Sequence, residues 1–234
     1  IHSARAKVRE AVSECLQDAL LQRYEQLTSS ATYAPDAAQI AARALRNTCL
    51  GYIGVADPER CVALAQQQFA ASAIMTYRHA ALVTLVHHGE PAVSESALEA
   101  FYEQFNDEPL VVNMWLQVQA SAPGDNVIKR VRQLLEHPAY DGRNPNKIRA
   151  LVGTFCNANP VNFHALDGSG YQLLRETVVE LNNSNPQIAS RLLTPLTKWR
   201  RYEQRQQLMR GELQAIAALP DLSRDVYEVV AKSL

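Results

Sequence analysis

Apolar residues recur three or four positions apart along most of this chain, and this spacing constrains its fold more than any other feature. In the first segment they form one stripe, at Val8, Val12, Cys15, Leu16, Ala19 and Leu20. Such a stripe is typical of an amphipathic helix, which we expect from Ser3 to Gln26. Similar stripes follow in 127–135 and 174–181. The segment 108–119 contains the β-favouring pair Val111-Val112, but it reads better as a buried helix.

We expect about eleven to twelve such helices and no convincing strand. Consecutive helices with short links pack antiparallel, so the sequence predicts an all-α fold stacked as an irregular α-solenoid, or superhelix. No clean repeat of about 34 or about 40 residues is present, which disfavours a regular tetratricopeptide or HEAT array. No linker rich in Ser, Gly or Pro divides the chain, so we expect residues 1–234 to form a single domain.

Helix starts are marked by a capping side chain, in most cases followed by Pro. The signals lie at Asp57-Pro58, Asn144-Pro145, Asn159-Pro160 and Asn185-Pro186. A helix is also expected to restart near Asp36 after a loop at 27–36. Ser96 with Glu99 has the spacing of a capping box, and Asp125 is expected to cap the helix at 127–135. The segment 186–218 predicts one long helix, kinked by Pro195 near Arg191 and Leu192.

Composition narrows the possible partners. The 234 residues carry a net charge of −1, which argues against nucleic acid or an anionic membrane as partner. No apolar run approaches about 18 residues, so we expect no transmembrane helix. The sequence begins with Ile1 rather than Met and shows no signal segment, so we expect it to be part of a longer cytoplasmic protein. Buried free thiols are expected at all four cysteines, with Cys15 and Cys61 at apolar helix positions.

The motifs of familiar catalytic sites are missing from the sequence. None of the six histidines has the His-Glu-x-x-His spacing of a zinc peptidase, and the adjacent pair His87-His88 suits a helix end better than a metal ion. The segment 168–170 lacks the rest of a phosphate loop and predicts a turn into a helix. Cys156 with His164 has no orienting third group, so a core thiol is favoured. We therefore expect no metal site and no catalytic residue in this chain.

A basic stretch contains Lys198, Arg200, Arg201, Arg205 and Arg210, interleaved with Trp199 and Tyr202. Basic and aromatic residues together can stack nucleic acid, but Glu203 and Glu212 dilute the charge. A solvated helix face with Trp199 in the core is the favoured interpretation.

Three residues near helix starts form a more specific candidate. Gln187 and Arg191 are four apart after Asn185-Pro186, and hence on one helix face. Arg149 lies in the second turn of the helix opened by Asn144-Pro145. Arginines near helix N-termini favour anions such as a carboxylate. From the residues alone, surface ion pairs are the favoured interpretation, and an anion-binding surface is the alternative.

Three motifs, at 144–153, 159–171 and 185–196, closely resemble the C-terminal helical domain of bacterial M1-family aminopeptidases. The resemblance is close over 108–234 and weaker over the first hundred residues. It implies that residues 1–234 are the C-terminal domain of a zinc exopeptidase that releases N-terminal residues from peptides. The zinc would lie in an upstream catalytic domain absent from this chain, so this chain alone would be inactive. The domain would enclose the active-site cavity, with that catalytic domain and short peptide substrates as its partners.

The resemblance also assigns residues. Arg149 matches the arginine of the family's Asn-Pro-Asn motif, and Gln187 and Arg191 match its second Asn-Pro motif. They would bind the leaving side of a short peptide, including its free carboxylate. In the motif at 163–171 we interpret His164, Asp167 and Gly168 as structural turn residues. The alternatives are a stand-alone helical-repeat scaffold for protein–protein interaction and, less favoured, a helical array that binds nucleic acid.

Overall fold

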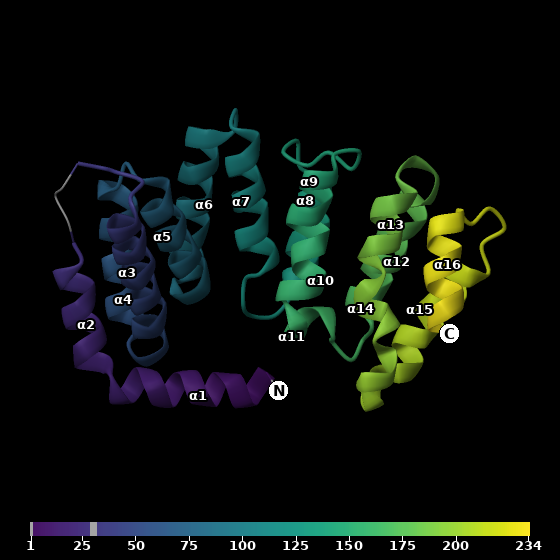
Figure 1. The fold of residues 1–234 in the computed structure, drawn as a ribbon, viewed down its shortest axis with the longest axis horizontal. Helices are drawn as coiled ribbons and strands as arrows, with labels where there is room; N and C mark the ends of the chain where they lie inside the picture. Colours follow the sequence, from purple (N-terminus) through teal and green to yellow (C-terminus); the bar gives the residue numbers. More distant parts are fainter. Residues whose placement is uncertain (1, 29–31) are drawn as a thin grey trace. The chain divides into compact units, whose positions relative to one another are not determined.

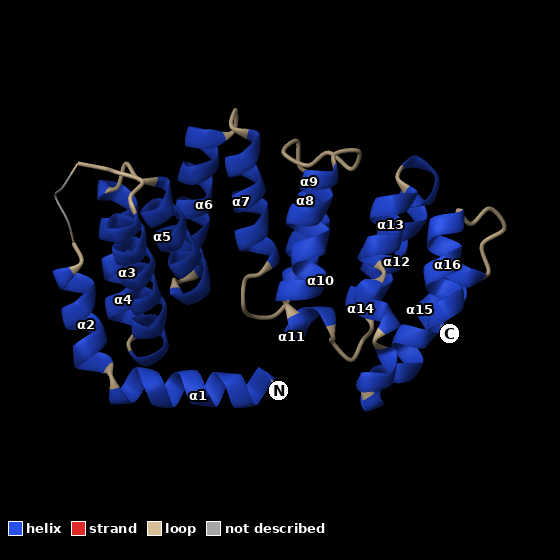
Figure 2. Cartoon of the chain, viewed as in Figure 1, coloured by secondary structure: helices blue, strands red, loops and turns tan. Residues whose placement is uncertain are grey.

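The computed structural model describes residues 2–28 and 32–234. Every regular element in these residues is a helix and none is a strand, which confirms the all-α prediction (Figure 2). The chain divides into two compact units, residues 1–106 and 107–234, which are described separately. The described residues form sixteen α-helices, so the number differs somewhat from the predicted eleven to twelve, because several predicted helices are divided into shorter ones.

The first unit holds six α-helices (Figure 1). They are α1 (His2–Cys15), α2 (Gln17–Gln26), α3 (Ala37–Ala56), α4 (Pro58–Ala71), α5 (Met75–His88) and α6 (Pro91–Phe105). Helices α3, α4 and α5 pack on one another, and their contact buries Leu50, Ile53, Cys61, Leu82 and Leu85. Helix α1 runs crosswise to these helices.

The first predicted helix is interrupted. Residues 3–26 form two helices, α1 and α2, that meet at Leu16, where the backbone leaves helical geometry with φ −113° and ψ 13°. The apolar stripe of α1 does not enter the core, since Val8 and Leu16 are exposed, as is Cys15. Helix α2 instead buries Tyr24. The prediction of one helix was wrong, because the chain turns at Leu16 and each half packs on α3 as a separate helix. The burial predicted for Cys15 was wrong as well.

Two predicted helix starts in this unit are confirmed and one is wrong. The Asp36 carboxylate accepts a hydrogen bond from the Gln39 N–H at 2.8 Å, and Asp57 does the same for the Arg60 N–H at 3.0 Å. The predicted loop at 27–36 includes residues 29–31, which lie outside the described residues. Ser96 does not begin a helix, because Pro91 already starts α6 five residues earlier.

The second unit begins with α7 (Pro109–Ala120) and α8 (Val127–Leu135). A continuous helical run follows, formed by α9 (Pro145–Ile148), the π-helical turn η1 (Arg149–Gly153) and α10 (Thr154–Ala158). The remaining elements are α11 (Pro160–Phe163), α12 (Ser169–Ser184), α13 (Pro186–Leu192), α14 (Thr194–Thr197), the 3₁₀ turns η2 (Trp199–Arg201) and η3 (Glu203–Arg205), α15 (Gln206–Ala217) and α16 (Arg224–Ser233).

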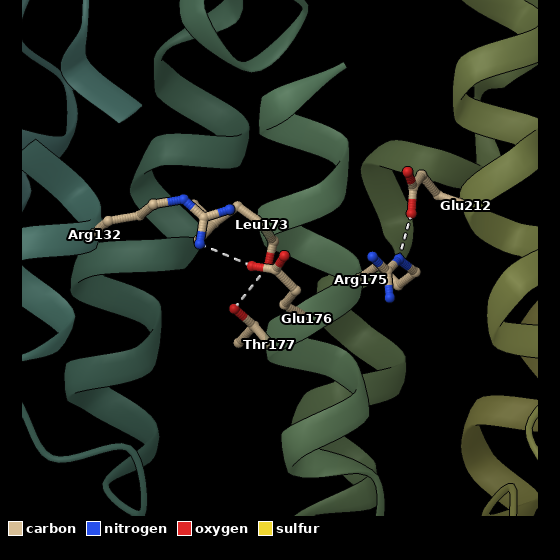
Figure 3. Close-up of polar contacts among 6 residues, drawn as sticks. All are labelled: Arg132, Leu173, Arg175, Glu176, Thr177 and Glu212. Carbon is tan, nitrogen blue, oxygen red and sulfur yellow. Dashed lines mark hydrogen bonds and ion pairs between the residues drawn. The ribbon is translucent and has the colours of Figure 1, made fainter. Parts of the chain in front are cut away.

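Helix α12 links elements on both of its sides (Figure 3). Its buried face carries Tyr171, Leu173, Leu174 and Val178. Arg175 pairs with Glu212 of α15 at 2.5 Å, and the next residue, Glu176, pairs with Arg132 of α8 at 2.9 Å. Each ion pair is partly exposed and contributes about 1 kcal/mol or less to stability. The buried apolar face therefore holds α12 in place, and the ion pairs add a small amount of stability.

All three Asn-Pro starts in the second unit are confirmed. The side chains of Asn144, Asn159 and Asn185 accept hydrogen bonds from N–H groups of the first turn that follows each of them. The cap predicted at Asp125 is wrong, because the residue that precedes α8 is Asn126. Its φ of 67° is a left-handed conformation, which Asn tolerates better than most residues.

The predicted long helix at 186–218 is broken into α13, α14, two 3₁₀ turns and α15. Pro195 lies in the first turn of α14, where its missing N–H costs nothing, and α13 ends three residues before it. Pro195 therefore ends the helix where a kink was expected, and the pieces pack as separate elements.

We predict opposite effects from two Gly→Ala substitutions in the second unit. A Cβ at Gly170 would lie 2.8 Å from the Phe163 Cα, which is backbone that cannot swing away, whereas a Cβ at Gly211 meets nothing within 4 Å. We expect Gly170→Ala to lower the free energy of unfolding by about 1–3 kcal/mol. Gly211→Ala lies within α15 and should raise it by about 0.5–1 kcal/mol through helix propensity.

Urea unfolding of the two variants, followed by circular dichroism, measures both changes. Equal effects, or a stable Gly170→Ala variant, would show that α11 and α12 are not in close backbone contact.

Candidate functional site

The first wall of the candidate site is the helical run from α9 to α10. Asn144 and Pro145 fix its start, and the next turn buries Lys147 and Ile148 while leaving Arg149 exposed. The turn from 149 to 153 is a π-helix, and the Thr154 N–H bonds back to the Arg149 carbonyl. A π-turn holds one residue more than an α-turn, so it shifts the faces of the residues that follow.

The second wall is α13. Asn185 caps this helix and Pro186 begins it. Ile188, Ala189 and Leu192 are buried, so the opposite face, which carries Gln187 and Arg191, is exposed. This confirms that Gln187 and Arg191 share one helix face.

The two walls enclose a pocket of about 430 Å³, which we call the double-arginine pocket. It is lined by Arg149, Gly153, Thr154, Asn157, Ala158, Ile188, Arg191 and Leu192. Two of the three predicted site residues, Arg149 and Arg191, therefore lie on one pocket although 42 positions separate them in the sequence. Gln187 lies on α13 one turn before Arg191 but does not line the pocket.

The charges in the double-arginine pocket are unbalanced. No carboxylate lines it, and in the described part of the chain neither arginine forms an ion pair, so the surface ion pairs favoured from the sequence do not form there. Arg149 is held by one neutral contact, in which its Nη1 donates to Asn146 Oδ1 at 3.1 Å. Two guanidinium groups beside a small apolar floor suit a carboxylate ligand.

Thr154 and Asn157 also line this pocket, and the sequence analysis did not identify them. Thr154 Oγ1 donates to the Arg149 carbonyl at 3.4 Å, and Asn157 Nδ2 donates to the Gly153 carbonyl at 2.8 Å. Asn157 donates through its amide nitrogen, so its amide oxygen can still accept a hydrogen bond. The π-turn brings these residues beside Arg149, and helical periodicity in the sequence gives no sign of that turn.

The motif at 163–171 forms a packed turn. His164 Nδ1 lies 2.8 Å from the Tyr171 hydroxyl, its ring stacks on Tyr202 at 4.3 Å between centroids, and its carbonyl accepts a hydrogen bond from Arg205 Nε. Asp167 accepts hydrogen bonds from the N–H and hydroxyl of Ser169. These contacts agree with the structural role inferred for His164 and Asp167.

Gly168 allows this turn, because its φ of 75° is in the left-handed region where other residues are strained. The next residue begins α12, so the sequence 168–170 is a turn into a helix, as the sequence predicts.

Burial shifts the pKa of the Cys156 thiol and the His87 imidazole. It raises the pKa of the Cys156 thiol, and His164 contacts Tyr171, so Cys156 fits the predicted core thiol. Burial, with a smaller effect of His88, lowers the pKa of His87 to about 4, so the end of α5 carries a neutral imidazole there. The described residues contain no group of three His, Cys, Asp or Glu side chains that could hold a metal ion.

The basic stretch around Trp199 is occupied by internal contacts. Trp199 is half-buried rather than in the core, and its Nε1 donates to the Ser233 carbonyl at 2.9 Å. The guanidinium groups of Arg200 and Arg210 lie 4.1 Å and 5.5 Å from the centre of its ring. None of the helices in the described residues is both long and apolar enough to cross a membrane.

Comparison with known proteins identifies close relatives. The family model described as a domain of unknown function (DUF3458_C) with ARM repeats matches residues 1–234. Aminopeptidase N of Escherichia coli (strain K12) is 38% identical over 236 residues, which cover 99% of this chain and 27% of that protein. Aminopeptidase N of Caulobacter vibrioides is 36% identical over 235 residues, with 100% and 27% covered.

A crystal structure of Legionella pneumophila aminopeptidase A in complex with aspartic acid matches with a TM-score of 0.88 and 28% identity. That match covers 99% of this chain and 28% of the solved chain. The chain thus spans about a quarter of the length of the curated relatives it matches. The predicted resemblance to aminopeptidase N is confirmed, and the ARM-repeat match agrees with the predicted α-solenoid.

We predict that the stability of the chain falls in acid partly because of His164. Burial, and then the charge of Arg205, lower its pKa from 6.5 to about 4. Below about pH 6.5, His164 binds a proton in the unfolded chain but stays neutral in the folded chain. Its contribution to the free energy of unfolding is therefore complete above pH 6.5 and is lost as the pH falls towards about 4. His164 is partly exposed, so we expect about 1–2 kcal/mol after allowance for solvent screening.

Urea unfolding at several pH values measures how the free energy of unfolding changes with pH. His164→Gln should reduce this pH dependence, and the control His2→Gln, on an exposed side chain, should not. The same pH dependence of the unfolding free energy in both variants would contradict the role given to His164.

Proposed function

Because the chain belongs to the DUF3458_C family of ARM-repeat domains and is similar to aminopeptidase N along its whole length, we propose that it is the C-terminal helical domain of a larger aminopeptidase. Residues 1–234 would act together as one domain of that enzyme. The double-arginine pocket would bind the free carboxylate end of a short peptide, on the leaving side of the bond that is cleaved.

One observation carries this proposal: Arg149 and Arg191 line the same pocket, and its lining in the described residues includes no carboxylate. A guanidinium binds a carboxylate through two parallel N–H···O bonds, and a charge-assisted bond contributes about 1.5–3 kcal/mol. The pocket of about 430 Å³ accommodates one or two residues of a peptide. Longer chains, whose carboxylate lies farther from the cleaved bond, would gain less from it.

Gln187 would assist at the edge of the pocket. It lies one turn before Arg191 on the same exposed face of α13, and its amide can donate to a carbonyl oxygen and accept from an N–H. A peptide presents both groups beside its terminal carboxylate. Gln187 would therefore orient the peptide backbone while the two arginines hold its charge.

The catalytic chemistry would lie outside this chain. The resemblance to M1-family enzymes implies zinc, and the described residues supply no cluster that fits a metal ion, so we assign zinc to another part of the polypeptide. Zinc would activate the attacking water there. This domain would help to enclose the cavity and, by holding the leaving side of the peptide, would reduce the freedom lost on reaching the transition state. We also propose a cytoplasmic location, supported by four free cysteines.

We predict that Arg149→Ala and Arg191→Ala, made in the full-length enzyme, selectively weaken the use of short peptides. The loss of one charge-assisted bond should raise KM for a tripeptide by about ten- to a hundredfold. The same tripeptide with an amidated C-terminus has no carboxylate to lose, and a single-residue chromogenic amide does not reach the pocket. The KM for each of these two substrates should change much less.

Steady-state kinetics on the three substrates test this prediction. Arg201→Ala is a matched control, because Arg201 is exposed in the same unit and does not line the pocket. An equal loss with all three substrates would contradict the carboxylate-binding role.

The size of the native gene product separates this proposal from a stand-alone helical scaffold. We expect an antibody against this chain to detect one band far above 26.0 kDa in a lysate of the source cells. A band at the mass of the chain would favour the scaffold, and an aminopeptidase role would then need a separate catalytic partner.

A further inference from the structure

The first unit holds a second pocket, larger than the double-arginine pocket and separate from it. Its volume is about 680 Å³, and α2, α3, α4 and α5 all contribute to its wall. The residues that matter for its chemistry are Tyr24, Arg46, Gln68, Ala73 and Tyr77. We call it the Arg46 pocket.

Arg46 is a buried cation at the wall of this pocket. Only 9% of this residue's surface is exposed. Its guanidinium carbon lies 4.1 Å from the centre of the Tyr24 ring and 5.0 Å from that of the Tyr77 ring. Contacts with aromatic rings compensate part of the cost of removing a cation from water.

The hydrogen bonds of Arg46 are incomplete. Its Nη1 donates to Gln68 Oε1, and its Nε is buried without a partner. Among the described residues no carboxylate pairs with it, and no hydrogen bond uses its Nη2. A buried charge is costly unless it is paired, so this guanidinium has unused capacity for an anion.

Gln68 holds this arrangement in place. Its oxygen also accepts a hydrogen bond from the Tyr24 hydroxyl at 2.9 Å. Its amide nitrogen donates to the Tyr77 carbonyl at 2.8 Å and to Asn47 Oδ1 at 3.2 Å. Gln68 therefore holds Arg46, the Tyr24 hydroxyl and the Tyr77 backbone before any ligand arrives, which lowers the ordering cost of binding.

The rest of the wall narrows the class of ligand. Leu64 and Ile74 supply apolar surface, and Tyr33 adds a third aromatic ring. Glu25, the only acidic residue in the described lining, disfavours a ligand with a second negative charge. We propose that the Arg46 pocket binds a small monocarboxylate with an apolar or aromatic body, whose carboxylate pairs with Arg46.

This site does not depend on the peptidase function proposed above. Its lining belongs to the first unit, whereas Arg149 and Arg191 belong to the second. Free apolar amino acids and short peptides fall within the proposed ligand class, but so do other carboxylates of that size.

The test is titration calorimetry on the full-length protein with N-acetyl-L-phenylalanine and its C-terminal amide. The two probes share the aromatic body, and only the first has a carboxylate. Both lack the free amino group that an aminopeptidase substrate presents. We expect the acid to bind and the amide to bind at least about tenfold more weakly.

Two variants in the first unit locate the binding. Ala73 is exposed and lines the Arg46 pocket, so Ala73→Trp should fill the pocket and abolish binding of the acid without disturbing the core. Ala63→Trp, on an exposed position of α4 outside the pocket, should leave it unchanged. Arg46→Met should weaken binding of the acid to the level of the amide. Circular dichroism checks that this variant folds.

Arg191→Ala separates this site from the double-arginine pocket. Binding of the acid should persist in Arg191→Ala. The proposal would be overturned if the acid failed to bind at millimolar concentration, if acid and amide bound equally, or if Ala73→Trp bound the acid normally. Loss of binding in Arg191→Ala alone would assign the acid to the double-arginine pocket, and this result would also overturn the proposal.

Discussion

The start of a helix at an Asn-Pro pair is the constraint on which the double-arginine pocket depends. The asparagine side chain satisfies an N–H of the first turn, and proline both presets φ and removes an N–H that has no partner there. Together they leave no freedom in where the helix begins. Asn144 and Asn185 each act in this way, so the residues a few positions later, Arg149 and Arg191, point in fixed directions.

The third Asn-Pro pair shows that such a cap can also join elements. Asn159 caps α11, and its amide nitrogen donates to the carbonyls of Ala120 and Ala122 at 3.1 Å and 2.9 Å. These carbonyls lie at and beyond the C-terminal end of α7, where a helix leaves its last carbonyls without partners. One buried side chain therefore satisfies the start of one helix and the end of another. Asn159 directly follows α10, so the same bonds also tie the end of the run α9–α10 to the end of α7.

The sequence predicted those features that depend on local chemistry. Five Asp or Asn caps are where the pattern placed them, because a cap and its N–H partner lie within three residues of each other. It failed where packing decides. The apolar stripe gives no sign of the break at Leu16, where α1 and α2 pack on α3 as separate helices, and the start of α8 depends on a left-handed residue at Asn126. Likewise, Arg149 and Arg191 could be selected from their motifs, but Thr154 and Asn157 join them only through the π-turn.

The two proposed sites would use arginine in opposite ways. Arg149 and Arg191 are exposed, so each contact with a ligand would replace water and bring a modest gain, and the two arginines together would supply the affinity. Arg46 has already lost most of its water on folding, at a cost that two tyrosine rings and Gln68 only partly offset. A carboxylate that reached it would pair with a desolvated charge, and such pairing is stronger in surroundings of low polarity. Because the cost of removing Arg46 from water is met on folding, this one buried arginine would do for its ligand what the two exposed arginines would do in the double-arginine pocket.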